Sequence, residues 1–186
     1  MVPLLSLWLP ILGSAILVFL ASSLMHTVLG YHANDFRRLP DEEGARRAMG
    51  SLDIPPGQYV IPYAGSSEAM RSPEYAEKLR TGPVAMLTVR PNGPFGMGKS
   101  LGLWFLYIVV VSLFAAYITS RAVGPAAEYL DVFRFAGTTA FAGYSLALVQ
   151  ESIWYWRDWR TTLINIADGL VYALLTAGVF GWLWPA

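Results

Sequence analysis

Four long apolar stretches constrain the fold of this chain more than any other feature of its sequence. They occupy residues 4–29, 100–120, 129–152 and 162–184. A helix rises about 1.5 Å per residue, so roughly 20 residues cross a hydrocarbon layer about 30 Å thick. Only 14% of the residues are charged, whereas a typical soluble domain has about 25%. The sequence therefore predicts a multi-pass membrane protein.

Two of these stretches have atypical features. The third is the weakest, because Arg134 lies near its start. The first has the position of a secretory signal, but no Lys or Arg precedes it. Its apolar run also exceeds the roughly 7–15 residues of a signal's apolar region. We therefore expect the first stretch to be retained as a membrane span.

The basic residues predict the orientation, because Lys and Arg gather in cytoplasmic loops. Residues 30–99 hold nine of the thirteen. Arg157 and Arg160, between the last two spans, lie on the same side, whereas the other side has Arg121, with Arg134 just inside the membrane. We expect Gly30–Lys99 to be cytoplasmic and both termini to be periplasmic. Tryptophans, which favour membrane interfaces, mark one end of the spans (Trp8, Trp182, Trp184) and the other (Trp104, Trp154, Trp156, Trp159).

Small residues recur at four-residue intervals in the last two spans. Such rows let helix backbones approach closely within lipid. The rows predict a compact four-helix bundle, although the same faces are suited to docking the helices of a partner. Their members are Thr139, Gly143, Ala147, Ala173, Ala177 and Gly181.

The segment between the first two spans is polar and rich in Pro and Gly. Its local signals predict, in order, a helix over Asp41–Met49, a strand over Gln58–Tyr63, a helix from Ser72 to Gly82 and a strand over Val84–Val89. These four elements offer too little apolar area for a confident independent core. We therefore expect this insert to rest on the membrane face of the bundle or on another protein.

The string "GPFGMGKS", residues 93–100, matches the phosphate-binding loop pattern G-x-x-x-x-G-K-[ST]. In nucleotide-binding proteins that loop precedes a helix packed on a parallel sheet. Here the following helix is a membrane span, and about 70 residues cannot supply such a sheet. Lys99 fits better as a basic anchor at the start of that span. We therefore expect no nucleotide binding.

Ionisable side chains within membrane spans are candidates for function. His26, Glu151 and Asp168 fall in the same leaflet of the expected topology, and together they suit a divalent metal or a proton relay. His32 follows His26 by six residues, a spacing that places the two on different faces of a continuous helix. That spacing argues against a two-histidine site on one helix.

A structural interpretation of these residues stays open. His26 and Glu151 suit interfacial positions in contact with water. Asp168 has three candidate partners, namely Arg157, Arg160 and Asn165. Arg134, with Asp131 and Glu128 nearby, suits an interfacial anchor.

The composition excludes several other classes of protein. The chain has no cysteine, so disulfides, thiolate metal sites and cysteine nucleophiles are absent. Its net charge is zero, which argues against nucleic acid as a partner. Neither a nucleophile elbow nor a dinucleotide fingerprint occurs. A haem held by two histidines would need His26 and His32 to come from separate chains or to flank a break in the helix, so no cofactor is expected.

Four segments of the sequence carry a resemblance to a protein family. They are "HANDFRRLPDEE", "GPVAMLTVRPNGPFGMGKSLGLWFLY", "VFRFAGTTAFAGY" and "DGLVYALLTAGVFGWLWP". Together they resemble a group of small bacterial inner-membrane proteins of unassigned function. The resemblance implies a bacterial inner-membrane setting and brings no functional residues with it.

The expected fold is an all-α membrane protein, a four-transmembrane-helix bundle with a small mixed α+β cytoplasmic insert between the first two helices. Such a chain contacts the lipid bilayer and either other membrane proteins or further copies of itself. The expected function is that of a non-catalytic accessory or scaffold subunit of a larger membrane complex. The alternative is a small oligomeric transporter or channel with a metal or proton site at His26, Glu151 and Asp168, and a membrane enzyme ranks third.

Overall fold

The computed structural model describes residues 2–94 and 96–185, which form two compact units. The bundle unit combines the chain up to Phe36 with the chain from Gly96 onward, and the insert unit begins at Arg37. The insert is therefore shorter than residues 30–99 of the sequence prediction. Its expected first residues, Gly30–Phe36, belong to the bundle unit.

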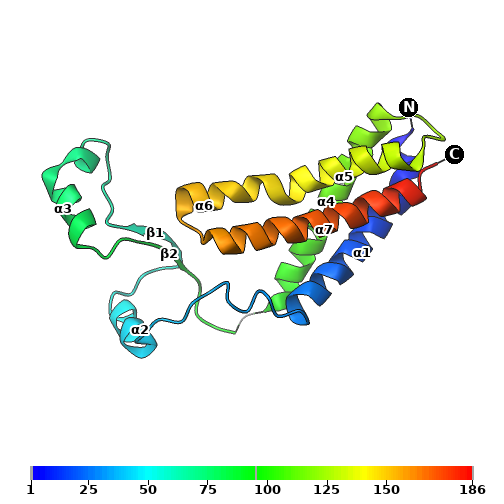
Figure 1. The fold of residues 1–186 in the computed structure, drawn as a ribbon. Helices are drawn as coiled ribbons and strands as arrows, with labels where there is room; N and C mark the ends of the chain where they lie inside the picture. Colours follow the sequence, from blue (N-terminus) through cyan, green and yellow to red (C-terminus); the bar gives the residue numbers. More distant parts are fainter. Residues whose placement is uncertain (1, 95, 186) are drawn as a thin grey trace. The chain divides into compact units, whose positions relative to one another are not determined.

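Long helices build the bundle unit (Figure 1). They are α1 (Trp8–Thr27), which follows a 3-10 turn over Leu4–Leu7, then α4 (Met97–Ala122), α5 (Tyr129–Ser145), α6 (Val149–Tyr155) and α7 (Trp159–Trp182). A 3-10 turn over Leu146–Leu148 joins α5 to α6, which continues in the same direction. Within the described residues, four segments are long and apolar enough to cross a membrane, in agreement with the sequence prediction: Leu4–Thr27, Met97–Ala122, Tyr129–Tyr155 and Trp159–Trp182.

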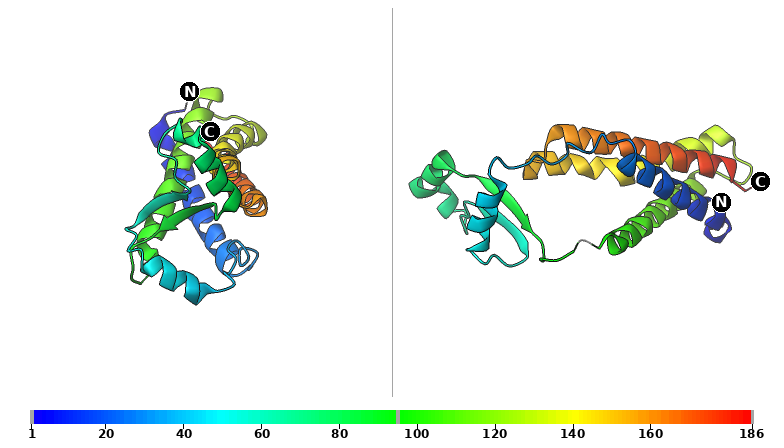
Figure 2. Two further views of the ribbon diagram at one scale, coloured as in Figure 1. Left: turned by 90° about the vertical axis from the view of Figure 1, so that its left-hand side faces the viewer. Right: turned by 90° about the horizontal axis from the view of Figure 1, so that it is seen from below.

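The four long segments pack in a ring, in the order α1, α4, α5, α7 and back to α1. Figure 2 shows α5 and α6 running alongside α7. Small side chains dominate the buried interior, including Ala15, Ala115 and Ala140. The Ser14 hydroxyl donates a hydrogen bond to the Ser112 hydroxyl at 3.1 Å, linking α1 to α4. This composition lets backbones approach closely where no hydrophobic effect operates between helices.

The small residues highlighted in the sequence occupy different environments. On α7, Ala173 and Ala177 are buried, and a Cβ added at Gly137 of α5 would lie 3.0 Å from that of Ala177. Gly181 makes room for the ring of Tyr129.

The row on α5 is less uniform than the row on α7. Gly143 packs against Val111 of α4. The Thr139 hydroxyl donates to the carbonyl of Phe135 on its own helix, and Ala147 is exposed in the 3-10 turn. The fully buried face of α5 passes instead through Ala136 and Ala140.

The insert unit contains α2 (Glu42–Gly50), β1 (Gly57–Ile61), α3 (Pro73–Thr81) and β2 (Ala85–Val89), as the local signals predicted. The carboxylate of Asp41 caps α2, and the Ser72 hydroxyl caps α3. The strands form an antiparallel ribbon in which Tyr59 pairs with Leu87. None of the described residues 37–94 is buried, so this unit has no core of its own.

Candidate functional site

A cluster of polar side chains lies where α1 ends beside α7. Metal-ligand atoms of His26, His32 and Asp168 all lie within 4.8 Å of one another. His26 is on the last turn of α1, His32 follows the end of that helix, and Asp168 projects from α7. We call these residues, together with Tyr31 and Asp35, the His–Asp cluster.

His32 bridges two carboxylates. Its Nδ1 lies 2.7 Å from Oδ2 of Asp35, and its Nε2 lies 2.8 Å from Oδ2 of Asp168. All three side chains are largely buried, with exposed fractions of 12% for His32, 12% for Asp35 and 6% for Asp168. An ionised carboxylate only accepts hydrogen bonds, so Nδ1–H donates to Asp35. Nε2 is then the nitrogen that faces Asp168.

Tyr31 holds the other oxygen of Asp168. Its hydroxyl donates to Oδ1 of Asp168 at 2.6 Å. Burial raises the pKa of Tyr31 above its usual value, and the hydrogen bond to Asp168 and the charge of that carboxylate raise it further. The phenol therefore stays protonated and remains a donor, which fixes the orientation of the Asp168 carboxylate.

His26 completes the cluster from the end of α1. Its Nδ1 lies 2.9 Å from the carbonyl oxygen of Ser22. Because a carbonyl only accepts hydrogen bonds, Nδ1–H donates to it, and Nε2 is the nitrogen left for a further contact. The rings of His26 and His32 stack with centroids 4.2 Å apart and planes 11° from parallel. The two imidazoles therefore lie face to face beside Asp168.

Local backbone structure brings these groups together. Helix α1 ends at Thr27, and Gly30 adopts a φ of 66°, a conformation that favours glycine. The turn that follows returns Tyr31 and His32 toward α7. At the next position along α7, a Cβ at Gly169 would meet Ser145 of α5, so α5 and α7 approach closely beside Asp168.

A tryptophan and three tyrosines pack beside the cluster. The Trp104 indole donates to the Ser22 hydroxyl at 2.9 Å, and its ring lies near those of Tyr107, Tyr144 and Tyr172. Trp104, which lies about two turns into α4, therefore contributes to packing between helices. The hydroxyls of Tyr144 and Tyr172 are buried and have no hydrogen-bond partner in the described part of the chain.

The structure places the sequence candidates unevenly. His26 and Asp168 come together, whereas Glu151 is exposed on α6 and lies outside the described group of ligand atoms. Arg134 pairs with Asp131 at 3.2 Å, a local charge pair of the expected kind. Lys99 lies in the first turn of α4.

The partners of Asp168 and Arg160 differ from those that the sequence suggested. Asp168 pairs with His32 and Tyr31, whereas the sequence offered Arg157, Arg160 and Asn165. Arg160 instead lies 4.0 Å from Oδ1 of Asp35.

The sequence argued only against a two-histidine site on one helix, and His26 and His32 meet instead because α1 ends between them at Thr27. Gly30 and the polar run "YHAND" after it are signals for the end of a helix. Those signals could have placed His32 and Asp35 on a turn that folds back. They could not have identified Asp168 as the group that the turn meets, since that contact spans 136 residues of chain.

Two imidazoles and a carboxylate form a donor set for first-row divalent metals such as zinc and iron. Without a metal, the same atoms form a buried polar cluster in which the His32 imidazole lies between two carboxylates. Comparison with known proteins does not separate these roles, because the chain matches no protein-family model, no curated protein and no solved structure.

Proposed function

We propose that this chain is a multi-pass protein of the bacterial inner membrane that binds a divalent first-row transition metal ion through His26, His32 and Asp168. The proposal rests on one observation, the convergence of two imidazole nitrogens and a carboxylate oxygen within 4.8 Å. Tetrahedral coordination at roughly 2.0–2.1 Å separates ligand atoms by about 3.4 Å. The proposal therefore requires the donors to move closer together than the separation of up to 4.8 Å seen here.

The partners of the ligands favour a metal site over a simple ion pair. Metal-binding histidines usually donate their second N–H to a carboxylate or a backbone carbonyl. Asp35 accepts that hydrogen bond from His32 at 2.7 Å, and the Ser22 carbonyl accepts it from His26 at 2.9 Å. Tyr31 orients Asp168 in the same way. Every proposed ligand therefore has its own supporting hydrogen bond.

The chemistry of the donor atoms restricts which metal ions the site favours. The three proposed ligands supply nitrogen and oxygen, and the chain has no cysteine to add a thiolate. Two imidazoles favour zinc, iron, cobalt or nickel over magnesium and calcium, which prefer oxygen ligands. Three protein ligands leave at least one coordination position for water or another molecule.

Zinc binding by the full-length protein in detergent tests this proposal. We expect the wild type to bind a single zinc ion per chain in isothermal titration calorimetry. Asp168→Asn should weaken binding well beyond the roughly 10–100-fold that loss of an outer hydrogen-bond partner costs. Glu151→Gln is the matched control, because Glu151 is an exposed carboxylate outside the group. Absence of zinc binding in the wild type, or equal binding in Asp168→Asn, contradicts the proposal.

A second candidate function is that the chain serves as an accessory subunit in a larger membrane complex. The insert favours this candidate. It contains two helices and a two-stranded ribbon, yet none of its described residues is buried. Such a unit gains stability from packing against a partner. Native mass spectrometry after mild extraction tests this candidate, which fails if the chain leaves its own membrane only as a monomer or a homo-oligomer.

A further inference from the structure

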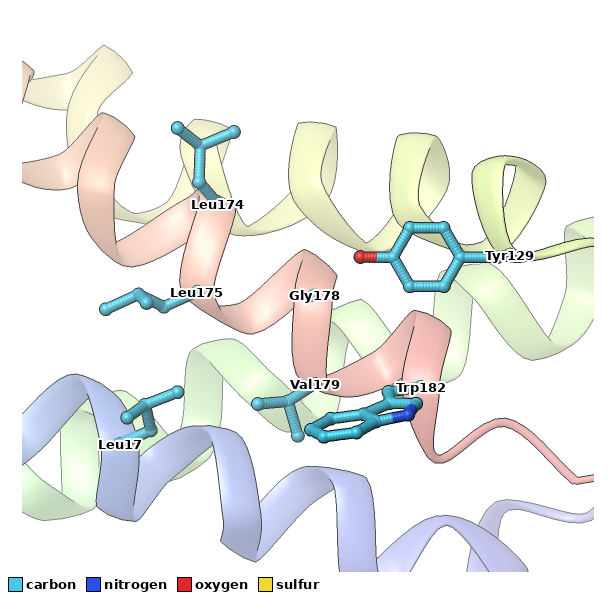
Figure 3. A pocket seen from close by; sticks show the side chains of 7 residues that line it. All are labelled: Leu17, Tyr129, Leu174, Leu175, Gly178, Val179 and Trp182. Carbon is cyan, nitrogen blue, oxygen red and sulfur yellow. The ribbon is translucent and has the colours of Figure 1, made fainter.

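A groove on the outer face of the bundle lies at the opposite end of α7 from the His–Asp cluster. It has a volume of about 440 Å³ and lies between α1, α5 and α7. Its lining is Leu17, Tyr129, Leu174, Leu175, Gly178, Val179 and Trp182 (Figure 3). The volume falls within the roughly 300–1,000 Å³ of small-molecule sites.

The groove has one polar end and one apolar end. Tyr129 is the first residue of α5 and Trp182 is the last residue of α7, so both mark the ends of their helices. Leucines of α1 and α7 line the rest, with the Tyr129 hydroxyl directed along the groove (Figure 3). Tyr and Trp favour the membrane interface. The apolar end therefore lies deeper in the hydrocarbon than the polar end.

The Tyr129 ring is held in place. Gly181 gives it room, because a Cβ there would lie 2.6 Å from the ring. The hydroxyl oxygen stands 3.8 Å from where a Cβ of Gly178 would lie, about one helical turn inside Trp182. The structure gives this hydroxyl no hydrogen-bond partner among the described residues. Tyr129 is 46% exposed on the outer face of the bundle, so a lipid in the groove can supply an acceptor for this hydroxyl.

We propose that the groove binds a diacyl glycerolipid, with one acyl chain along Leu17, Leu174 and Leu175 and an ester carbonyl accepting a hydrogen bond from Tyr129. A bilayer lipid has this order of groups, in which the ester lies just below the headgroup and the acyl chain runs inward from it. Gly178 leaves the floor of the groove open for the chain. The inference concerns a separate site and does not depend on metal binding.

Native mass spectrometry of the full-length protein tests this site with two added probes. One is a diester phosphatidylglycerol, and the other is its diether analogue with the same headgroup and chain lengths. We expect wild type to retain the diester lipid about five-fold more strongly than the diether lipid, the effect of a hydrogen bond worth about 1 kcal/mol. Tyr129→Phe should bind both lipids at the weaker level. Tyr107→Phe is the matched control, since the Tyr107 hydroxyl bonds to the carbonyl of Gly143 and lies outside the groove.

A second pair of variants tests the groove itself. Gly178→Leu fills it, and we expect retention of either lipid to fall at least ten-fold. Gly102→Leu makes the same change on α4, where a Cβ meets nothing within 4 Å, and should bind as wild type does. Equal retention by Gly178→Leu and Gly102→Leu overturns the site. Equal binding of diester and diether lipid by wild type, or retention of a free fatty acid in place of the diester lipid, overturns the assigned ligand.

Discussion

Among single residues, Asp168 depends most on partners elsewhere in the chain, because its carboxylate is buried in an apolar helix. Its side chain is 6% exposed and lies on a helix long and apolar enough to cross a membrane, where a carboxylate is costly. His32 contacts one of its oxygens and Tyr31 the other. The turn after α1 therefore supplies both partners of this carboxylate, and it does so from consecutive positions.

Asp35 provides a prediction at the same scale. Its carboxylate accepts the Nδ1–H of His32, which orients the imidazole and makes Nε2 a stronger ligand. Asp35→Asn should keep all three metal ligands and still lower zinc affinity by about 10–100-fold, as measured by calorimetry. Asp131→Asn is the control, because it also removes one carboxylate of a charge pair. Unchanged zinc affinity in Asp35→Asn would show that this contact does not tune the site.

The residues of the His–Asp cluster differ in how well the sequence alone could predict their roles. His26 and Asp168 stand out because polar side chains are rare within apolar spans. Tyr31, His32 and Asp35 lie in a short polar turn that resembles many loops. Their roles depend on a contact with α7 that no local pattern encodes.

For the elements, the insert and the bundle were predictable to different degrees. Ser72 and Gly82 are local capping signals, and they delimit α3 as expected. Asp41, expected as the first residue of its helix, instead caps α2. The break between α5 and α6 could not be predicted from a helix-breaking residue, because residues 145–148 include no Pro or Gly. Ser145 instead directs its hydroxyl to the carbonyl of Ile166 on α7 at 3.4 Å. Such a contact depends on the neighbouring helix and is invisible in the sequence of α5.

The α5–α7 interface provides the prediction at this scale. Ala177 is fully buried, and its Cβ would lie 3.0 Å from a Cβ at Gly137. Ala177→Leu should therefore overpack the interface and cost about 1–3 kcal/mol of unfolding free energy. Ala142→Leu makes the same change at an exposed position of α5 and should be nearly neutral. Unfolding in mixed detergent micelles, followed by circular dichroism, compares the two variants, and equal stability would refute close packing at Ala177.

At the scale of the whole molecule, the distribution of basic residues predicts the orientation in the membrane. We propose that the insert and the turn between α6 and α7 are cytoplasmic, because most basic residues lie in these segments. The His–Asp cluster lies at the end of α1 that leads into the insert. This orientation would give the site access to cytoplasmic metal ions, whereas the lipid groove would lie toward the periplasmic leaflet.

The absence of native cysteine makes the orientation directly measurable. Ser67→Cys places a thiol at an exposed position of the insert, and Glu128→Cys places one at an exposed position just before α5. In intact cells, a membrane-impermeant maleimide should label the Glu128→Cys variant and leave the Ser67→Cys variant unlabelled. Inside-out vesicles should give the reverse pattern, and wild type should stay unlabelled in both. Labelling of Ser67→Cys in intact cells would invert the topology and turn the His–Asp cluster toward periplasmic metal ions.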